Sequence, residues 1–232
     1  MLAPMSWPNS TQRGIGLIEL MIGVTVGLIV ATGASVMLVR QLAEHHRLML
    51  EAQLQQDLRA VADLLLRELR RAGYWSMAQK GVWADGATAP LNNVYAATLP
   101  ANAQDSNSVE YSYSRADAVN PEDNLLDAGR EQFGFMLESG ILKLRLGNSW
   151  QPLTDKSTLT ITGFNVRLNV QELTLDDYCN SPCAAGNLSC PPHLQMRRFD
   201  VSLTGRATND PALLRRLTLS SKLRNDLIKG SC

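Results

Sequence analysis

The sequence has no excess of charge of either sign. Its 232 residues include 22 Lys and Arg and 22 Asp and Glu, so the formal net charge is zero. A strongly basic nucleic-acid-binding protein and an acidic tail protein are excluded, because each needs a charge imbalance to produce its field. We therefore expect no nucleic-acid partner. Apolar residues make up 45% of the chain, which is enough to fold one domain or one domain with an extension.

The sequence also lacks the short motifs of common active sites. It contains no G-x-S-x-G, no H-E-x-x-H and no P-loop. His193 follows Cys190 by three residues, but two prolines lie between them, so the spacing is a weak indication of a Cys–His pair. We expect no catalytic residue, no cofactor, no metal and no enzymatic activity.

Cysteine is scarce and confined to the last quarter of the chain, at Cys179, Cys183, Cys190 and Cys232. An even, clustered set is typical of an oxidising compartment, so disulfides are the favoured prediction. A zinc site is an alternative, although the usual C-x2-C pair is missing; free thiols are another. Four cysteines allow three complete pairings, and the spacing does not choose among them.

Long apolar sequence is confined to one run, Ile15 to Val39, which carries a single charge at Glu19. At ~1.5 Å per residue the run is ~37 Å long as a helix, enough to cross a membrane. A cleaved secretory signal has a shorter apolar region. A plain signal anchor explains the length but not Glu19, because a carboxylate inside such a span costs about 2.5–3.5 kcal/mol.

The residues around Glu19 read Arg-Gly-Ile-Gly-Leu-Ile-Glu-Leu, from Arg13 to Leu20. They resemble the class III signal of type IV pilins and pseudopilins, which runs Lys/Arg-Gly and then Phe-Thr-Leu-Ile-Glu-Leu. This sequence departs from that form at Ile15 and Gly16. The resemblance implies that prepilin peptidase removes residues 1–14 by cutting between Gly14 and Ile15, and that Ile15 is then N-methylated.

Cleavage would create a positive amine four residues before Glu19. A buried carboxylate is costly alone but tolerable when paired with a cation. In pilin filaments the equivalent glutamate is thought to neutralise the amine of a neighbouring subunit or its own. We therefore expect Glu19 to set the register of this subunit against its neighbour during assembly.

The segment 40–73 continues the helix with an amphipathic pattern. Apolar residues recur at steps of three and four on one helical face, and charged residues occupy the others. No proline interrupts the chain from Ile15 to Gly73, and Gly73 is a plausible stop. We predict one helix over these residues, with residues 15–39 in the membrane or the filament core. The apolar stripe consists of Leu50, Leu54, Leu58, Val61, Leu65, Leu69 and Ala72.

The segment 74–232 is predicted to be a β-rich periplasmic head. Residues 76–108 and 115–129 look like long loops. Alternating patterns predict strands near residues 109–113, 132–137, 141–146, 159–170, 198–204 and 213–223. Strands after a long helix give an α+β fold, an antiparallel sheet packed on the amphipathic helix.

Two loops of the head carry candidate sites. The insertion 178–193 holds three cysteines and is predicted to be a surface loop that a disulfide closes. Cys232 could tie the tail to this loop. Asp117, Glu122, Asp123 and Asp127 form an acidic stretch that would suit calcium, although its spacing matches no EF-hand. A solvated polar loop is the alternative, and the sequence does not choose between them.

Three segments resemble the PilW family of minor pilins: Asp57–Ala60, Glu68–Trp75 and Lys222–Asn225. The resemblance implies an inner-membrane protein with a periplasmic head that primes type IV pilus assembly, in a tip complex with other minor pilins, the major pilin and a large tip adhesin. A J-type pseudopilin of type II secretion shares this layout. An uncleaved, signal-anchored periplasmic binding or sensor domain is a third reading.

Overall fold

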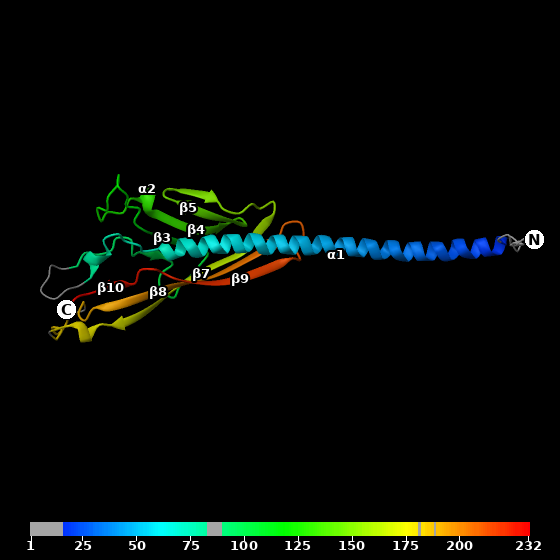
Figure 1. Ribbon diagram of the computed structural model, residues 1–232. Coiled ribbons are helices and arrows are strands. Elements are labelled where there is room, and N and C mark those ends of the chain that lie inside the picture. Colours follow the sequence, from blue (N-terminus) through cyan, green and yellow to red (C-terminus); the bar gives the residue numbers. More distant parts are fainter. Residues whose placement is uncertain (1–15, 83–89, 181, 188) are drawn as a thin grey trace, which may run out of the picture. The chain divides into compact units, whose positions relative to one another are not determined.

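The computed structural model describes residues 16–82, 90–180, 182–187 and 189–232 (Figure 1). The chain divides into two compact units, residues 1–49 and 50–232. The helix α1 (Leu17–Arg71) supplies residues to both. The prediction of one helix over this region is confirmed, with the described helix starting two residues after Ile15 and ending two before Gly73.

The end of α1 is set by Gly73, which has a φ of +73°. This left-handed conformation is easy only for a residue without a Cβ, and it is typical of the residue just past a helix. The Gly73 amide donates to the Ser112 carbonyl at 2.8 Å, and the Tyr74 amide donates to Arg71 at 2.9 Å. The end of the helix is therefore hydrogen-bonded directly to the strand residue Ser112, and the predicted stop at Gly73 is confirmed.

The second unit contains two antiparallel sheets within the described residues, where the sequence predicted one. The first sheet has the order β1-β3-β4-β5-β6. Its strands β4 and β5 form the predicted hairpin, joined by the two-residue turn Ser139–Gly140. The strands are β1 (Thr98–Leu99), β3 (Ser108–Ser112), β4 (Gln132–Glu138), β5 (Ile141–Leu146) and β6 (Ser149–Pro152).

The second sheet is built around one long strand, β8. One edge of β8 pairs with β7 along its whole length, and the other pairs first with β10 and then with β9. Strand β2 pairs with the far edge of β7. The strands are β2 (Asp105–Ser106), β7 (Leu159–Thr174), β8 (His193–Ala207), β9 (Leu214–Lys222) and β10 (Leu227–Lys229).

Short helical turns and strands occupy segments that the sequence predicted as loops. Residues 76–108 contain η1 (Ala78–Gly81) together with β1 and β2, and residues 115–129 lead into α2 (Ala128–Glu131). The segment between β7 and β8 contains η2 (Asp176–Tyr178). Each of these elements is only two to four residues long, so none has enough residues to show a hydrophobic period.

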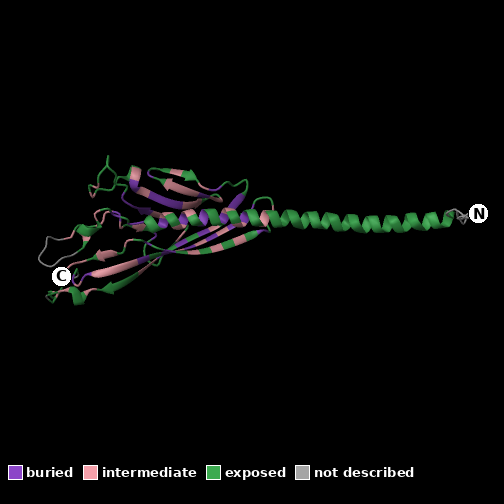
Figure 2. Ribbon diagram, in the orientation of Figure 1, coloured by how far each residue is buried: buried purple, intermediate pink, exposed green. Residues whose placement is uncertain are grey.

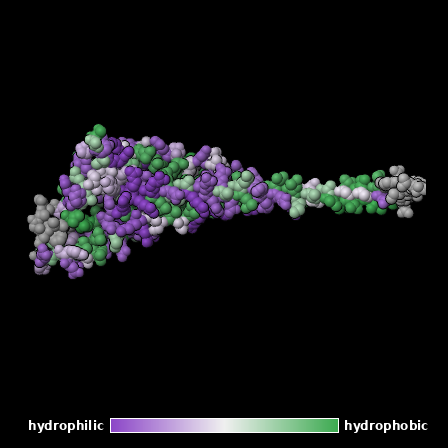
Figure 3. All heavy atoms as spheres, viewed as in Figure 1, coloured by the Kyte–Doolittle hydropathy of each residue, from purple (hydrophilic) through white to green (hydrophobic). Residues whose placement is uncertain are grey.

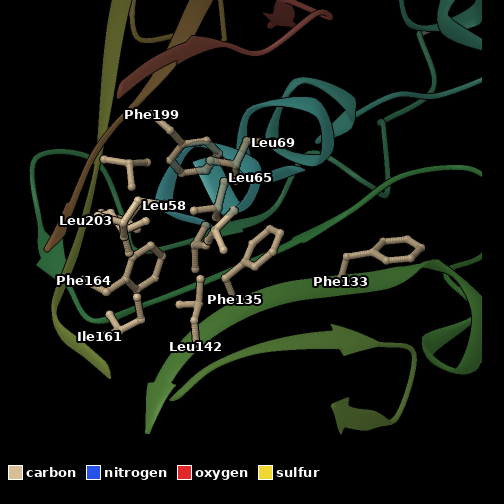
Figure 4. Packing of buried hydrophobic residues seen from close by; sticks show 14 of the residues in the cluster. Leu58, Leu65, Leu69, Phe133, Phe135, Leu142, Ile161, Phe164, Phe199 and Leu203 are labelled. Carbon is tan, nitrogen blue, oxygen red and sulfur yellow. The ribbon is translucent and has the colours of Figure 1, made fainter. Parts of the chain in front are cut away.

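The core lies where α1 meets both sheets of the second unit. Figure 4 shows Leu58, Leu65 and Leu69 of α1 beside Phe164 and Phe199 of the second sheet and Phe135 of the first. The alternation of buried and exposed colours along this part of α1 in Figure 2 marks the predicted stripe, which is buried from Leu54 to Ala72. Truncating one such leucine to alanine typically costs about 2–5 kcal/mol.

A polar and aromatic contact also fixes α1 on the first sheet. The Tyr113 hydroxyl donates to Glu68 at 3.3 Å, and the guanidinium of Arg71 lies 4.2 Å from the Tyr113 ring centre. The other side of this ring stacks on Phe133, with the centres 4.1 Å apart. Burial, and then the nearby Glu68 carboxylate, raise the pKa of Tyr113 to about 12, so the hydroxyl stays a donor at neutral pH.

Candidate functional site

The first unit exposes an apolar helix surface. Every described residue from 16 to 49 is exposed, including Leu17 at 77% and Ile29 at 71%. Figure 3 shows hydrophobic side chains along this part of α1. Among the described residues, α1 is the helix that is long and apolar enough to cross a membrane. An apolar surface of this extent is costly in water, so lipid or other protein chains must cover it.

The hydroxyl groups in this stretch are satisfied within the helix. Thr25 donates to the Met21 carbonyl at 3.0 Å, and Thr32 donates to the Leu28 carbonyl at 2.7 Å. Ser35 makes the equivalent bond to Ala31 at 2.8 Å. Because their hydrogen bonds are local, these groups can lie in an apolar medium without a partner from outside. Between residues 16 and 39 they leave Glu19 as the polar group that needs an external partner, whereas the charged residues Arg40, Glu44 and Arg47 follow the apolar run.

Glu19 lies in the first turn of α1 and is exposed. The Glu19 amide donates to the Gly16 carbonyl at 3.0 Å, so the helix turn is already formed around it. The partial positive charge of a helix N-terminus favours a carboxylate there, but by far less than transfer into hydrocarbon costs. No ion pair joins Glu19 to another described residue. The structure thus presents an unsatisfied charge beside the start of an apolar helix.

The predicted cleavage site, Gly14 and Ile15, lies outside the described residues. The assignment of cleavage and N-methylation to these positions therefore stays a prediction from the sequence. Gly16, the first described residue, carries the carbonyl that starts α1. The geometry places Glu19 within one helical turn of this point.

All four cysteines are paired, as predicted. Cys179 is bonded to Cys232 and Cys183 to Cys190, with Cα separations of 5.4 and 5.5 Å. These two bonds are one of the three pairings that the sequence left open. The Cys179–Cys232 bond ties the tail to the loop before β8. The sulfur atoms of Cys179, Cys183 and Cys190 lie within 4.8 Å of one another, but as disulfide sulfurs they are not thiolate ligands. The Cys190 sulfur is likewise no free nucleophile for a pair with His193.

The acidic stretch folds around its own backbone donors. Asp117 accepts from the amides of Val119 and Asn120 at 2.8 and 2.7 Å. Asp127 caps α2 by accepting from the Gly129 amide at 2.8 Å. These are local side-chain-to-backbone bonds of the kind that shape turns. The carboxylates of Asp117 and Asp127 therefore already have structural partners in the backbone.

Glu122 of the acidic stretch and Glu131 of α2 converge on a tyrosine that the sequence did not single out. The buried Tyr95 hydroxyl lies 3.0 Å from Glu122 and 3.1 Å from Glu131. Burial would raise the pKa of Glu122, but donors on Ser114, Ser76, Asn124 and Tyr95 outweigh it and lower that pKa. Burial, with Glu122 next, raises the pKa of Tyr95 well above its ordinary value. The cluster joins the segments around Tyr95 and Glu122 to the end of α2 through charged hydrogen bonds.

Arg197 on β8 is a second buried group that sequence reasoning missed. It is only 3% exposed, and its guanidinium donates to the carbonyls of Ala96 at 2.6 Å and Asn225 at 3.4 Å. Burial lowers its pKa. Arg197 lies one residue before the predicted strand 198–204, but a period of two places it on the same buried face as Phe199 and Val201, and this is the signal that could have found it. Arg197 holds the segment that leads into β10 against β8.

Two family comparisons fit this architecture. Residues 9–35 match the prokaryotic N-terminal methylation motif, which covers the apolar start of α1 and Glu19. Residues 47–223 match the family described as prepilin peptidase-dependent protein B, which covers α1 from Arg47 and both sheets except β10. Searches of curated proteins and of solved structures found no match. The chain therefore belongs to the prepilin peptidase-dependent protein B family and is a type IV pilin-like protein.

Proposed function

We propose that this protein is a minor pilin that primes the assembly of type IV pili. Prepilin peptidase cuts between Gly14 and Ile15, and Ile15 becomes the N-methylated terminus. The methylation motif over residues 9–35 and the peptidase-dependent family support this step. The role is structural and needs no catalytic residue or cofactor.

The observation that carries the proposal is the exposed apolar surface of α1 with Glu19 at its start. In the bilayer, lipid covers this surface while the β-rich head lies in the periplasm. On assembly, the same surface moves from lipid to an apolar filament core, so little apolar area meets water at either stage. Glu19, the only charge between Ile15 and Val39, then needs a cation, and the amine of Ile15 in a neighbouring subunit is the one that cleavage supplies.

We propose that the head acts through its partners, as a PilW-like subunit. These partners are the other minor pilins, the major pilin and a large tip adhesin, joined in a complex at the pilus tip. The resemblance of Asp57–Ala60, Glu68–Trp75 and Lys222–Asn225 to PilW supports this role.

Deleting the gene and scoring two phenotypes tests the proposal. The proposal predicts a loss of surface pili with normal release of exoproteins, restored by the intact gene. A loss of exoprotein release with normal piliation would instead make the chain a J-type pseudopilin. Normal piliation and normal exoprotein release, together with an uncleaved N-terminus, would instead support a signal-anchored periplasmic binding or sensor domain.

A further inference from the structure

A groove of about 770 Å³ lies between the end of α1 and the chain that follows β9. It is lined by five cationic side chains and one acidic one, which is a local excess on a chain of zero net charge. All five cations are exposed. The lining residues are Asp63, Leu66, Arg67, Arg70, Arg71, Lys222, Leu223 and Arg224.

Three of the five cations have no ion-pair partner in the part of the chain that the structure describes: Arg67, Arg70 and Arg224. The other two are only partly compensated. Arg71 lies 3.3 Å from Glu68, and Lys222 lies 3.2 Å from Asp226. Like charges that share a groove repel one another, and an anionic partner would relieve that repulsion.

The two walls of the groove are fixed to each other. The Arg224 amide donates to the Arg70 carbonyl at 3.2 Å, and the Leu223 amide donates to the Arg197 carbonyl at 3.0 Å. Leu223 itself is fully buried. The backbone that carries Arg224 is therefore anchored to α1 on one side and to β8 on the other. The backbone positions of the cations are therefore fixed before any partner arrives, which lowers the ordering cost of binding.

We propose that this basic groove binds an acidic helical segment of a neighbouring pilin-like subunit, an inference that rests on the proposed function. Arg70 and Arg71 follow Arg67 by three and four residues, so the Cβ atom of each lies about 5–6 Å from that of Arg67 on the helix surface. Carboxylates at the same spacing on a partner helix match these positions. Arginine suits this role because its planar fork binds a carboxylate through two parallel hydrogen bonds.

The acidic groups around the groove favour this partner over a nucleic acid. Asp63 lines the groove, and Glu68 and Asp226 are in contact with its cations. A continuous phosphate backbone would meet these carboxylates, and a chain of zero net charge gives it no long-range attraction. A helix with a few spaced carboxylates can avoid them.

The test is a binding measurement on the full chain in detergent. The probe is a fluorescent helical peptide that carries glutamates at i, i+3, i+4 and i+7, and its partner probe has glutamine at those positions. The variant is Arg67→Gln with Arg224→Gln. The matched control is Arg59→Gln with Arg206→Gln, which removes the same charge from exposed positions that do not line the groove. A 20-base-pair DNA duplex is measured in parallel at the same salt.

The proposal predicts that the glutamate peptide binds, that the glutamine peptide does not, and that the groove variant weakens binding at least tenfold. The control pair should change it less than twofold. Equal losses in both variants, no binding of the peptide, or tighter binding of the duplex would each overturn the proposal. Leader cleavage and piliation are scored separately in the same strains. If the groove does not bind the peptide although the leader is cleaved and pili form, only the groove proposal is overturned and the proposed function stands.

Discussion

The sulfur atom of Cys232 is bonded to that of Cys179, which joins the end of the sequence to the segment between β7 and β8. The two residues are 53 positions apart, whereas Cys183 and Cys190 are only 7 apart. A cross-link restricts the unfolded chain more when it closes a longer loop. The Cys179–Cys232 bond therefore contributes more to stability, and it holds β10 close to β8.

Replacing both Cys179 and Cys232 by serine should lower the free energy of unfolding by about 4 kcal/mol, the value expected for a loop of this length. The pair Cys183→Ser and Cys190→Ser is the matched control and should cost about 2 kcal/mol. Urea unfolding of the full chain in detergent measures both. Equal losses, or a larger loss in the control, would contradict the assigned importance of the longer loop.

Gly205 on β8 lies against Leu58 of α1. A Cβ there would sit 2.9 Å from Leu58 Cδ2 and 2.8 Å from Leu159 Cδ1. Gly205→Ala should therefore strain the core and cost about 1–3 kcal/mol. On β7, a Cβ at Gly163 would meet Thr204 at an ordinary 3.5 Å, so Gly163→Ala should cost clearly less. Urea midpoints compare the two, and equal shifts would refute this packing.

The hydrogen bonds that lower the pKa of Glu122 predict acid sensitivity of the head. Because the pKa is lower in the folded chain, this stabilisation is complete above the ordinary value of 4.5. It is lost as the pH falls through the lower pKa of the folded state. Glu122→Gln should reduce stability at pH 7 and flatten its decline between about pH 5 and pH 3. Urea unfolding across that range measures the slope.

The control for Glu122 is Asp177→Asn, which changes an exposed carboxylate in η2. It should leave the slope unchanged. If Glu122→Gln kept the full acid-side decline of the wild-type chain, the cluster around Tyr95 would not be its source.

Glu19→Ala should lower incorporation of the subunit into assembled filaments at least tenfold, because the amine of a neighbouring Ile15 would lose its counter-charge. Thr25→Ala is the matched control, since the Thr25 hydroxyl bonds only within the helix. Immunoblots of sheared filaments against whole cells measure the incorporated fraction. Unchanged incorporation of the Glu19 variant would remove the register role.

The sequence predicted α1 and its buried face well because the pattern repeats over many turns. The stripe from Leu54 to Ala72 is buried as predicted, and the hairpin of β4 and β5 follows from two alternating runs. Alternation also located β3, β7, β8 and β9, although β7 and β8 extend beyond the predicted bounds. In each case one local period carried the prediction.

The sequence could not predict features that depend on distant pairing. Strands β1 and β2 have two residues each and are defined by their partners β3 and β7, so residues 76–108 read as loop. The division of the strands into two sheets also depends on which distant strands pair, so local patterns did not predict it. The disulfide pairing was open because spacing permits three arrangements. The burial of Arg197 depends on carbonyls at Ala96 and Asn225, which are far from it in sequence.

In the proposed maturation, the polar leader is removed and the apolar helix is kept, with its new amine available to Glu19. Intact-mass analysis and N-terminal sequencing of the chain purified from cells with and without prepilin peptidase test this most directly. We expect a chain that begins at Ile15 with one added methyl group when the peptidase is present, and at Met1 when it is absent. A chain that still begins at Met1 in piliated, peptidase-positive cells would contradict this maturation.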